Sequence, residues 1–439
     1  MSKKGYKSIP WLFGKEIEIP EEWEVVSLGS LCNTFTKQTG FDYTTHIKPK
    51  LVQTFKKGTI PFIQNKDFEG KTTNYDTDYF IPENIANIFT KILLNEKCLL
   101  ITISGNIGNV GIFSNEQNAF VGGAVAVAKF KNKNLLNWIM YYLLSSMGHK
   151  NFLRLTKTAS HQNLILDDLR KMKVLILPLP EQQKIATILS NVDNLIDSTS
   201  KIIKNSKSLK KSLMQKLLTR GIGHSKFKKV RLFPRYNEET IPEDWNVDRL
   251  DNLIRIMDYR GRTPLFSESG ITHLRSNNIR DGQINFKDIT FVSEKTYEEY
   301  MTRGIPQEDD VLFTTEGPLG EVALVPKNFK FSLAQRIIVL RPKSKIIPKF
   351  LKYLLLDRKV RTRYEGLATG TTLGGIASKW FTKLFLPYPK DISEQQQIAS
   401  ILINIDAQID SQTQYKDKLE RLKKSLMQKL LTGEVRVAI

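Results

Sequence analysis

Two short polar stretches lie 211 residues apart in this chain of 439 residues. The first is Gln64-Asn65-Lys66-Asp67, and the second is Arg275-Ser276-Asn277-Asn278. Arg and Lys side chains fit the acceptor edge of guanine, whereas Asn and Gln side chains fit the edge of adenine. The residue types of both stretches therefore predict hydrogen bonding to the edges of DNA bases.

Three further pairs of loops have a similar composition and spacing. Lys37-Gln38-Thr39 and Arg260-Gly261-Arg262-Thr263 are basic, Ser104-Gly105-Asn106 and Glu316-Gly317 are turns that let the backbone approach a phosphate, and Thr156–Gln162 is matched by Thr369–Thr372. Each residue taken singly is as typical of a solvated turn, so the prediction rests on the whole set. The candidate DNA-binding residues are Lys37, Gln38, Thr39, Gln64, Asn65, Lys66, Ser104, Asn106, Thr158, Ser160, His161, Gln162, Arg260, Arg262, Arg275, Ser276, Asn277, Asn278, Thr369, Thr371 and Thr372.

The motifs of cofactor chemistry do not occur in the sequence. Gly70-Lys71-Thr72 lacks the glycine that a phosphate-binding loop needs five residues earlier, where Asn65 stands. No glycine-rich dinucleotide fingerprint follows a strand, and Leu386-Pro387-Tyr388-Pro389 only superficially resembles the tetrapeptide of DNA amino-methyltransferases. The five histidines have no metal-ligand spacing. We therefore expect no catalytic residue, no metal site and no cofactor in this chain.

The charge balance points to a polyanionic partner, either nucleic acid or an anionic membrane surface. Lys and Arg number 66 against 45 acidic residues, which gives a net charge of +21. Two cysteines cannot build a disulfide framework, so a reducing compartment is expected. We find no signal-peptide pattern and no apolar run long enough to cross a bilayer. These observations predict a cytoplasmic protein that binds DNA and no membrane.

The ends of the two halves are nearly identical. The string LKKSLMQKLLT occurs at Leu209–Thr219 and again 213 residues later at Leu422–Thr432. EQQKIATIL at Glu181–Leu189 returns as EQQQIASIL at the same distance, and IPEEW at Ile19–Trp23 returns as IPEDW. The centres match far less well, so the sequence predicts a duplicated domain with fixed ends and divergent middles.

The repeated ends predict two long helices that pair as a coiled coil. From Glu181 to Thr219 there is no Gly or Pro, and apolar residues recur at alternating steps of four and three. A second stripe, at Ile185, Leu189, Val192, Ile196 and Ile203, widens the apolar face and is assigned to a docking partner. The predicted seam contains Ile188, Val192, Leu195, Ile202, Leu209, Leu213, Ile401, Ile405, Tyr415, Leu422 and Leu426.

Between the helices the chain is expected to mix α and β structure. Short β-like runs occur at Cys98–Ile103, Ala124–Phe130, Val311–Thr315 and Arg336–Arg341. The predicted fold class is α+β, with two mixed domains, an antiparallel coiled coil and an internal pseudo-two-fold repeat. The predicted bounds are 1–178 for the first recognition domain, 179–220 for the first spacer helix, 221–390 for the linker and second recognition domain, and 391–439 for the second spacer helix and tail.

These repeated motifs resemble specificity subunits of type I restriction–modification systems. The resemblance covers essentially the whole chain. It departs from the pattern in the second copy, where Asp391-Ile392-Ser393 separate the prolines from Glu394. It is carried by Ile19–Trp23, Pro178–Ala186, Leu209–Thr219, their second copies and the tail Arg220–His224.

The resemblance implies a non-catalytic subunit with two target recognition domains, each of which reads one half of an asymmetric, bipartite DNA site. It also implies that two modification (methyltransferase) subunits dock on the coiled coil with S-adenosylmethionine, and that restriction subunits add ATP- and Mg-dependent translocation and cleavage. About 39 helical residues span roughly 58 Å, or some 17 base pairs of DNA.

Two other classes were weighed. A single-chain restriction–methylation enzyme would need the motifs that the sequence lacks. A coiled-coil scaffold that joins proteins would have no use for the charge and the two unlike, loop-rich domains.

Overall fold

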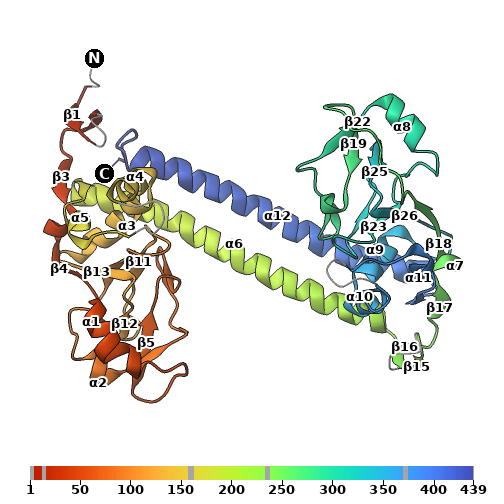
Figure 1. Ribbon diagram of the computed structural model, residues 1–439, viewed down its shortest axis with the longest axis horizontal. Coiled ribbons are helices and arrows are strands. Elements are labelled where there is room, and N and C mark those ends of the chain that lie inside the picture. Colours follow the sequence, from red (N-terminus) through yellow and green to blue (C-terminus); the bar gives the residue numbers. More distant parts are fainter. Residues whose placement is uncertain (1–3, 12–15, 157–162, 233–237, 369–373, 439) are drawn as a thin grey trace. The chain divides into compact units, whose positions relative to one another are not determined.

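The computed structural model describes residues 4–11, 16–156, 163–232, 238–368 and 374–438. The chain forms two compact units (Figure 1). The first contains Met1–Ser200 and Tyr415–Ile439, and the second contains Lys201–Gln414. The long helices α6 (Leu179–Arg220) and α12 (Ile392–Leu430) each contribute one part to each unit.

Two sheets form the centre of the first unit. The larger is antiparallel with the order β11-β10-β13-β4, built from β4 (Cys32–Lys37), β10 (Cys98–Thr102), β11 (Val110–Phe113) and β13 (Val125–Phe130). The smaller has the order β8-β5-β12-β9, built from β5 (Thr59–Ile63), β8 (Phe80–Pro82), β9 (Leu93–Leu94) and β12 (Ala119–Val121). Strand β10 is buried on both faces, because Leu99 and Ile101 pack under helix α3 (Leu136–Leu144) while Leu100 packs toward the smaller sheet.

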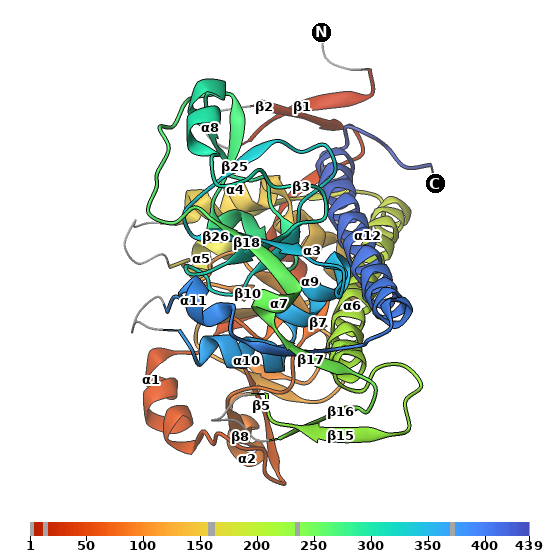
Figure 2. The same cartoon turned by 90° about the vertical axis from the view of Figure 1, so that its right-hand side faces the viewer.

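The second unit repeats this arrangement. Its antiparallel sheet has the order β18-β26-β23-β24, built from β18 (Ile254–Asp258), β23 (Val311–Thr314), β24 (Val322–Leu324) and β26 (Ile337–Pro342). Strands β18 and β26 lie side by side in Figure 2. The smaller sheet has the order β22-β19-β25, built from β19 (Ile271–Leu274), β22 (Thr290–Val292) and β25 (Phe331–Leu333). The duplication therefore extends through the divergent centres as well as the ends.

Shorter elements complete the two units. In the first unit they are β1 (Tyr6–Pro10), β2 (Glu16–Pro20), β3 (Glu24–Ser27), α1 (Gly40–Asp42), β6 (Phe68–Glu69), β7 (Thr72–Thr73), α2 (Glu83–Ala86), α4 (Ser146–Leu155), α5 (Leu166–Arg170) and β14 (Lys173–Ile176). In the second they are β15 (Phe227–Val230), β16 (Glu239–Pro242), β17 (Asn246–Arg249), α7 (Leu250–Leu253), β20 (Ile279–Arg280), β21 (Gln283–Ile284), α8 (Glu294–Tyr300), α9 (Pro348–Leu356), α10 (Arg358–Glu365), α11 (Ser378–Phe381) and β27 (Phe385–Tyr388).

Within each unit the parts of α6 and α12 run antiparallel and pack together. In the first unit Ile185 and Leu189, near the start of α6, share a core with Leu430 at the end of α12. In the second unit Leu217, near the end of α6, shares a core with Ile398 near the start of α12. The predicted pairing of the two helices is therefore confirmed, and each helix begins within two residues of its predicted start.

The seam between the helices differs from the predicted one at alternate layers. Val192 and Ile405 are buried as predicted, and Ile188, Leu213 and Leu426 are partly buried. The exposed members are Leu195, Ile202, Leu209, Ile401, Tyr415 and Leu422, so their assignment to the seam is wrong. The stripe that the sequence assigned to a docking partner, which includes Ile185 and Leu189, is the one that packs inward.

The seam continues through lysines that the sequence pattern placed outside it. Lys423 of α12 lies 2.6 Å from Asp193 of α6, and Asp193 also accepts a hydrogen bond of 2.6 Å from Tyr141 of α3. The second unit repeats this cluster with Lys210, Asp406 and Tyr353, at 2.5 and 2.7 Å. Each cluster thus ties one recognition sheet and its helix α3 or α9 to both long helices.

No helix in the described ranges is long and apolar enough to cross a membrane.

Candidate nucleic-acid interface

The predicted loops of the first unit meet at one end of its two sheets. Gly122 follows β12 and donates a hydrogen bond of 2.8 Å to Ile63, the last residue of the neighbouring parallel strand β5. Asn65, just after β5, accepts a hydrogen bond of 3.2 Å from the side chain of Asn109 through its backbone oxygen. A Cβ atom at Gly105 would lie 3.3 Å from Nδ2 of the Asn65 side chain. The turns after β5, β10 and β12 are therefore neighbours, and the first two contain candidate residues from the sequence.

Gln38 is the unusual member of this group. Its side chain is only 4% exposed, and neither Oε1 nor Nε2 has a hydrogen-bond partner among the described residues. A Cβ atom at Gly123 would lie 3.3 Å from Oε1. An unpaired buried amide costs about 1–3 kcal/mol, so the first unit carries this amide at a cost.

Two of the other predicted residues of the first unit, Thr39 and Lys66, have contacts within the unit. Thr39 is a helix N-cap, since its hydroxyl accepts a hydrogen bond of 3.1 Å from the backbone of Asp42. Lys66 forms an exposed ion pair of 2.5 Å with Asp78, which raises the pKa of the lysine. Lys37 and Asn106 are exposed and Ser104 is half-buried.

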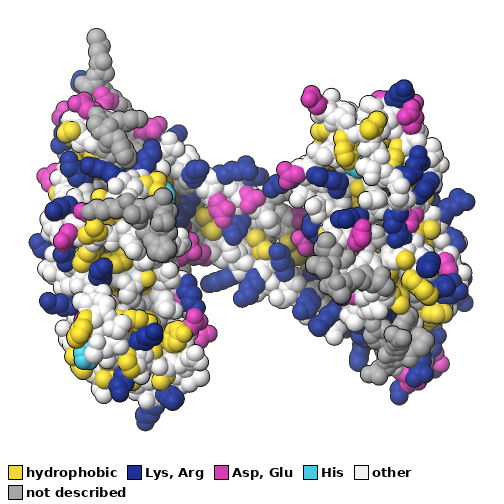
Figure 3. Space-filling view, in the orientation of Figure 1, with side chains coloured by type: hydrophobic (Ala, Val, Ile, Leu, Met, Phe, Trp, Pro, Cys, Tyr) yellow, Lys and Arg dark blue, Asp and Glu magenta, His cyan; other side chains and the backbone are white. Residues whose placement is uncertain are grey.

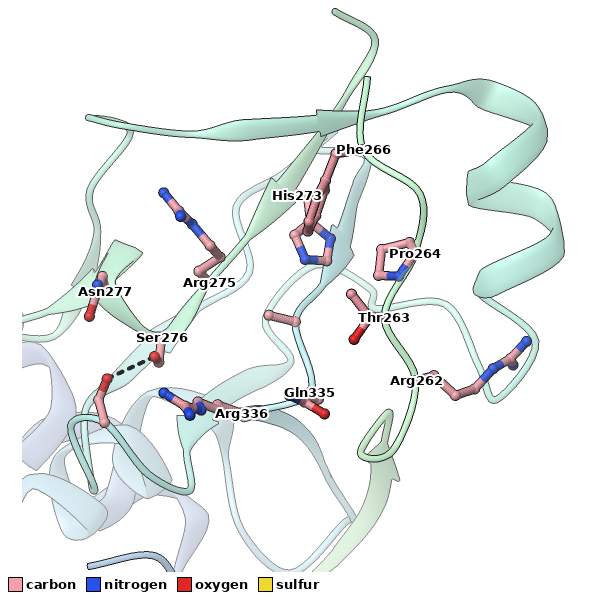
Figure 4. A pocket seen from close by; sticks show the side chains of 12 residues that line it. Arg262, Thr263, Pro264, Phe266, His273, Arg275, Ser276, Asn277, Gln335 and Arg336 are labelled. Carbon is pink, nitrogen blue, oxygen red and sulfur yellow. Dashed lines mark hydrogen bonds between the residues drawn. The ribbon is translucent and has the colours of Figure 1, made fainter. Parts of the chain in front are cut away.

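The second unit has a cavity of about 310 Å³ at the equivalent end of its sheets (Figure 4). Strand β19 and the turn that follows it form one wall, and the segment after β25 forms another. The cavity is lined by Arg262, Thr263, Pro264, Phe266, His273, Arg275, Ser276, Asn277, Gly317, Ala334, Gln335 and Arg336.

Three arginines give this cavity its charge. Arg262 donates to the hydroxyl of Thr302 at 2.9 Å, and Arg275 donates to the backbone oxygen of Asp288 at 2.6 Å. Arg336 forms an ion pair of 2.9 Å with Glu316 through Nε. All three have contacts that fix the side chain, which favours recognition of a planar acceptor edge over loose attraction.

The wall of the cavity also carries a neutral histidine. His273 is 2% exposed, and its Nδ1 lies 2.7 Å from the hydroxyl of Ser332. Burial, and to a smaller extent the charge of Arg275, lowers the pKa of His273 to about 4. The ring is therefore uncharged at neutral pH, and the positive charge of the cavity comes from the arginines.

Several predicted residues of the second unit hold the loops in place through their own hydrogen bonds. Arg260 donates to Asp258 at 2.8 Å and also contacts Ser378. Asn278 donates to two backbone oxygens, at 3.0 Å each, across the turn after β19. Ser276 lines the cavity and donates to the backbone oxygen of Gly317 at 2.9 Å.

The fourth pair of predicted loops contains the remaining candidate residues. Its residues Thr158, Ser160, His161, Gln162, Thr369, Thr371 and Thr372 lie outside the described ranges.

Phe266, Gln335 and Arg336 line the cavity but were not among the residues predicted from the sequence. Gln335 and Arg336 come just after β25, and β25 pairs in parallel with β19, which ends at Leu274. The signal was available in the repeat, because β25 matches β12 at a distance of 212 residues. Phe266 lies in a long segment without a clear pattern.

Metal-ligand clusters are not found in the described residues. No group of three or more His, Cys, Asp or Glu side chains there could hold a metal ion. Cys32 and Cys98 are buried free thiols, and burial raises the pKa of each to about 12. Neither is a thiolate nucleophile at neutral pH.

Comparison with known proteins decides the family. Residues 20–206 and 242–421 match the type I restriction modification DNA specificity domain, once in each half. The chain belongs to this family. It is therefore a DNA specificity subunit of a type I restriction–modification system, a non-catalytic subunit whose family leaves the enzymatic activities to modification and restriction subunits.

Relatives of this specificity subunit match most of the chain. It is 28% identical to the type I restriction enzyme MjaVIII specificity subunit of Methanocaldococcus jannaschii, over 96% of this chain and 95% of that one. It is 26% identical to the EcoBI specificity subunit of Escherichia coli over 61% and 60%. The fold matches the crystal structure of the S subunit from M. genitalium with a TM-score of 0.57 at 16% identity, over 93% of this chain and 96% of that one.

Proposed function

We propose that the two units of this specificity subunit read the two halves of one asymmetric, bipartite DNA site. The observation that carries the proposal is a repeated pair of sheets whose loops, at equivalent positions, bear different side chains. Where the first unit has Gly123 and Ala124 after β12, the second has Gln335 and Arg336 after β25. The same scaffold with different reading groups is suited to two different half-sites.

The recognition domains are taken as residues 1–178 and 221–390, and the helical regions as 179–220 and 391–439. In this proposal α6 and α12 set the length of the spacer between the half-sites, because α6 is an unbroken helix of 42 residues. Lys and Arg side chains are spread over the face of each unit that Figure 3 shows, and they supply the attraction to phosphates.

The helices also offer a surface for protein partners. The exposed apolar residues of α6 each precede a seam position by one residue, and the same is true in α12. In an antiparallel pair such positions of both helices lie along one flank. The first unit contributes Leu195, Tyr415 and Leu422 to this flank, and the second contributes Ile202, Leu209 and Ile401. We assign the two sets to two modification (methyltransferase) subunits.

Asp193 and Asp406 lie on the opposite flank, where they bind Tyr141 and Tyr353 of the recognition sheets' helices. The apolar flank is therefore not the one that these helices cover. In the assembled enzyme the modification subunits supply S-adenosylmethionine, and restriction subunits add ATP and Mg. The free thiols of Cys32 and Cys98 fit a complex that works in the cytoplasm.

Co-purification tests the partner and the role together. The chain is co-expressed with the methyltransferase subunit of its own system, and the complex is recovered through a tag on the specificity subunit. We expect two methyltransferases per specificity subunit and DNA binding that weakens steeply with salt. A chain that binds no methyltransferase would refute the proposal. DNA binding that is insensitive to salt would favour the scaffold alternative.

A further inference from the structure

The repeat isolates two side chains that only the second unit possesses. Strand β25 pairs in parallel with β19, as β12 pairs with β5 in the first unit. The residues that follow β25 are Ala334, Gln335 and Arg336, whereas Gly122, Gly123 and Ala124 follow β12. Gln335 and Arg336 are both exposed at the mouth of the cavity. The second unit thus places a long basic and a long polar side chain where the first places almost none.

Among the described residues, nothing hydrogen-bonds to the outer edge of the Arg336 guanidinium. Its Nε lies 2.9 Å from Oε1 of Glu316, and 46% of the side chain is exposed. Nη1 and Nη2 make no hydrogen bond within the described part of the chain. The guanidinium lies beside Gly317, where an added Cβ would come within 3.1 Å of Nη1. Gly317 also has φ of +51°, so a glycine suits both the turn and the space.

We propose that Arg336 reads a guanine of the second half-site in the major groove, with Glu316 as the residue that orients it. The two terminal nitrogens of an arginine match O6 and N7 of guanine, which is the commonest base-specific contact in protein–DNA complexes. This assignment rests on the proposed function.

Base reading explains the site better than phosphate binding does. A phosphate placed on Nη1 and Nη2 would lie near the carboxylate of Glu316, which repels it, whereas the guanine edge is uncharged. The neighbouring His273 is neutral and adds no attraction for phosphate. Phe266, 56% exposed, and Pro264 form an apolar wall beside the arginines, which is a surface suited to bases rather than to phosphates (Figure 4).

The test uses the full-length chain in complex with its methyltransferase partner and a library of duplex DNA with randomised half-sites. Arg336→Lys keeps the charge and loses the two-pronged edge, and Glu316→Gln keeps the arginine and loses its partner. Arg280→Lys is the matched control, because Arg280 is exposed in the same unit and does not line the cavity.

We expect Arg336→Lys to lower the preference for guanine at one position of one half-site by about 10- to 100-fold. Glu316→Gln lowers the same preference by a smaller factor, while Arg280→Lys changes nothing. A uniform loss over all sequences, with a salt dependence weaker by about one phosphate contact, would overturn the assignment. An unchanged profile in both variants would overturn it as well. If the wild-type complex selects no bipartite site, the proposed function itself fails.

Discussion

The corrected seam makes a sharp prediction for two leucines of α6 that are six residues apart. Leu189 is fully buried between the helices and the first recognition sheet, whereas Leu195, which the sequence pattern favoured, is 45% exposed. Leu189→Ala removes buried methyl groups and leaves a cavity, which costs about 2–5 kcal/mol. Leu195→Ala removes side-chain atoms that already contact water, and we expect a cost of less than about 1 kcal/mol.

Thermal unfolding of the purified chain measures the difference. For a unit of about 200 residues, each kcal/mol lowers Tm by roughly 2–4 °C. Leu189→Ala should therefore lower the transition of the first unit by about 4–20 °C, and Leu195→Ala should leave it within a few degrees. Binding to the methyltransferase subunit should show the reverse order, with the larger loss in Leu195→Ala. Equal destabilisation by the two substitutions would refute the corrected seam.

Three further predictions follow from the clusters and the helices. Asp193→Asn removes the negative charge that pairs with Lys423 and strengthens the hydrogen bond from Tyr141, so it should destabilise the first unit by about 1–3 kcal/mol. Asp406→Asn should do the same to the second unit. Urea unfolding followed by separate probes of the two units measures both effects, and a loss in the wrong unit would contradict the assignment. A matched insertion of four residues in both helices, near Ser206 and at its counterpart, should add about 6 Å to each helix and lengthen the preferred DNA spacer by nearly two base pairs. Site selection from a library of spacer lengths measures this change. An unchanged spacer would show that the helices do not set its length. The pKa of His273 is about 4 in the folded chain and about 6.5 in the unfolded chain, so the unfolded chain binds the proton first as the pH falls. The second unit should therefore lose up to about 3 kcal/mol of stability between these two pH values. His273→Gln should flatten that pH dependence of stability, and an unchanged slope would show that the histidine is not its cause.

The sequence predicted the long helices well because their signals are local. An unbroken run without Gly or Pro, apolar residues at steps of four and three, and identical strings in two places specify their ends closely. The choice of the packed face was wrong for a physical reason. Two rows of side chains along α6 share Val192 and Leu213. The predicted row contains Leu209 and looks more apolar than the other row, which contains Lys210. In the structure the row that contains Lys210 faces the partner helix, where Lys210 pairs with Asp406.

The candidate DNA interface was predictable in part. Arg275 and Asn277 come directly after a strand, and their residue types indicated base contacts. Arg336 belongs beside them only because β25, some 60 residues later in the chain, pairs with β19. That pairing is a long-range contact which no local pattern records. Only the comparison of the two halves shows that Gln335 and Arg336 are the counterparts of Gly123 and Ala124 in the first unit.

Exchange of one recognition domain tests the central claim most directly. Residues 24–178 are replaced by the equivalent region of a full-length relative with a known site, and the hybrid is expressed with its methyltransferase subunit. Methylated sites are then mapped by sequencing the DNA of the host. Two units that read separately predict a new bipartite site in which one half-site has changed and the other has not. A change in both half-sites, in a hybrid that still assembles, would contradict the account.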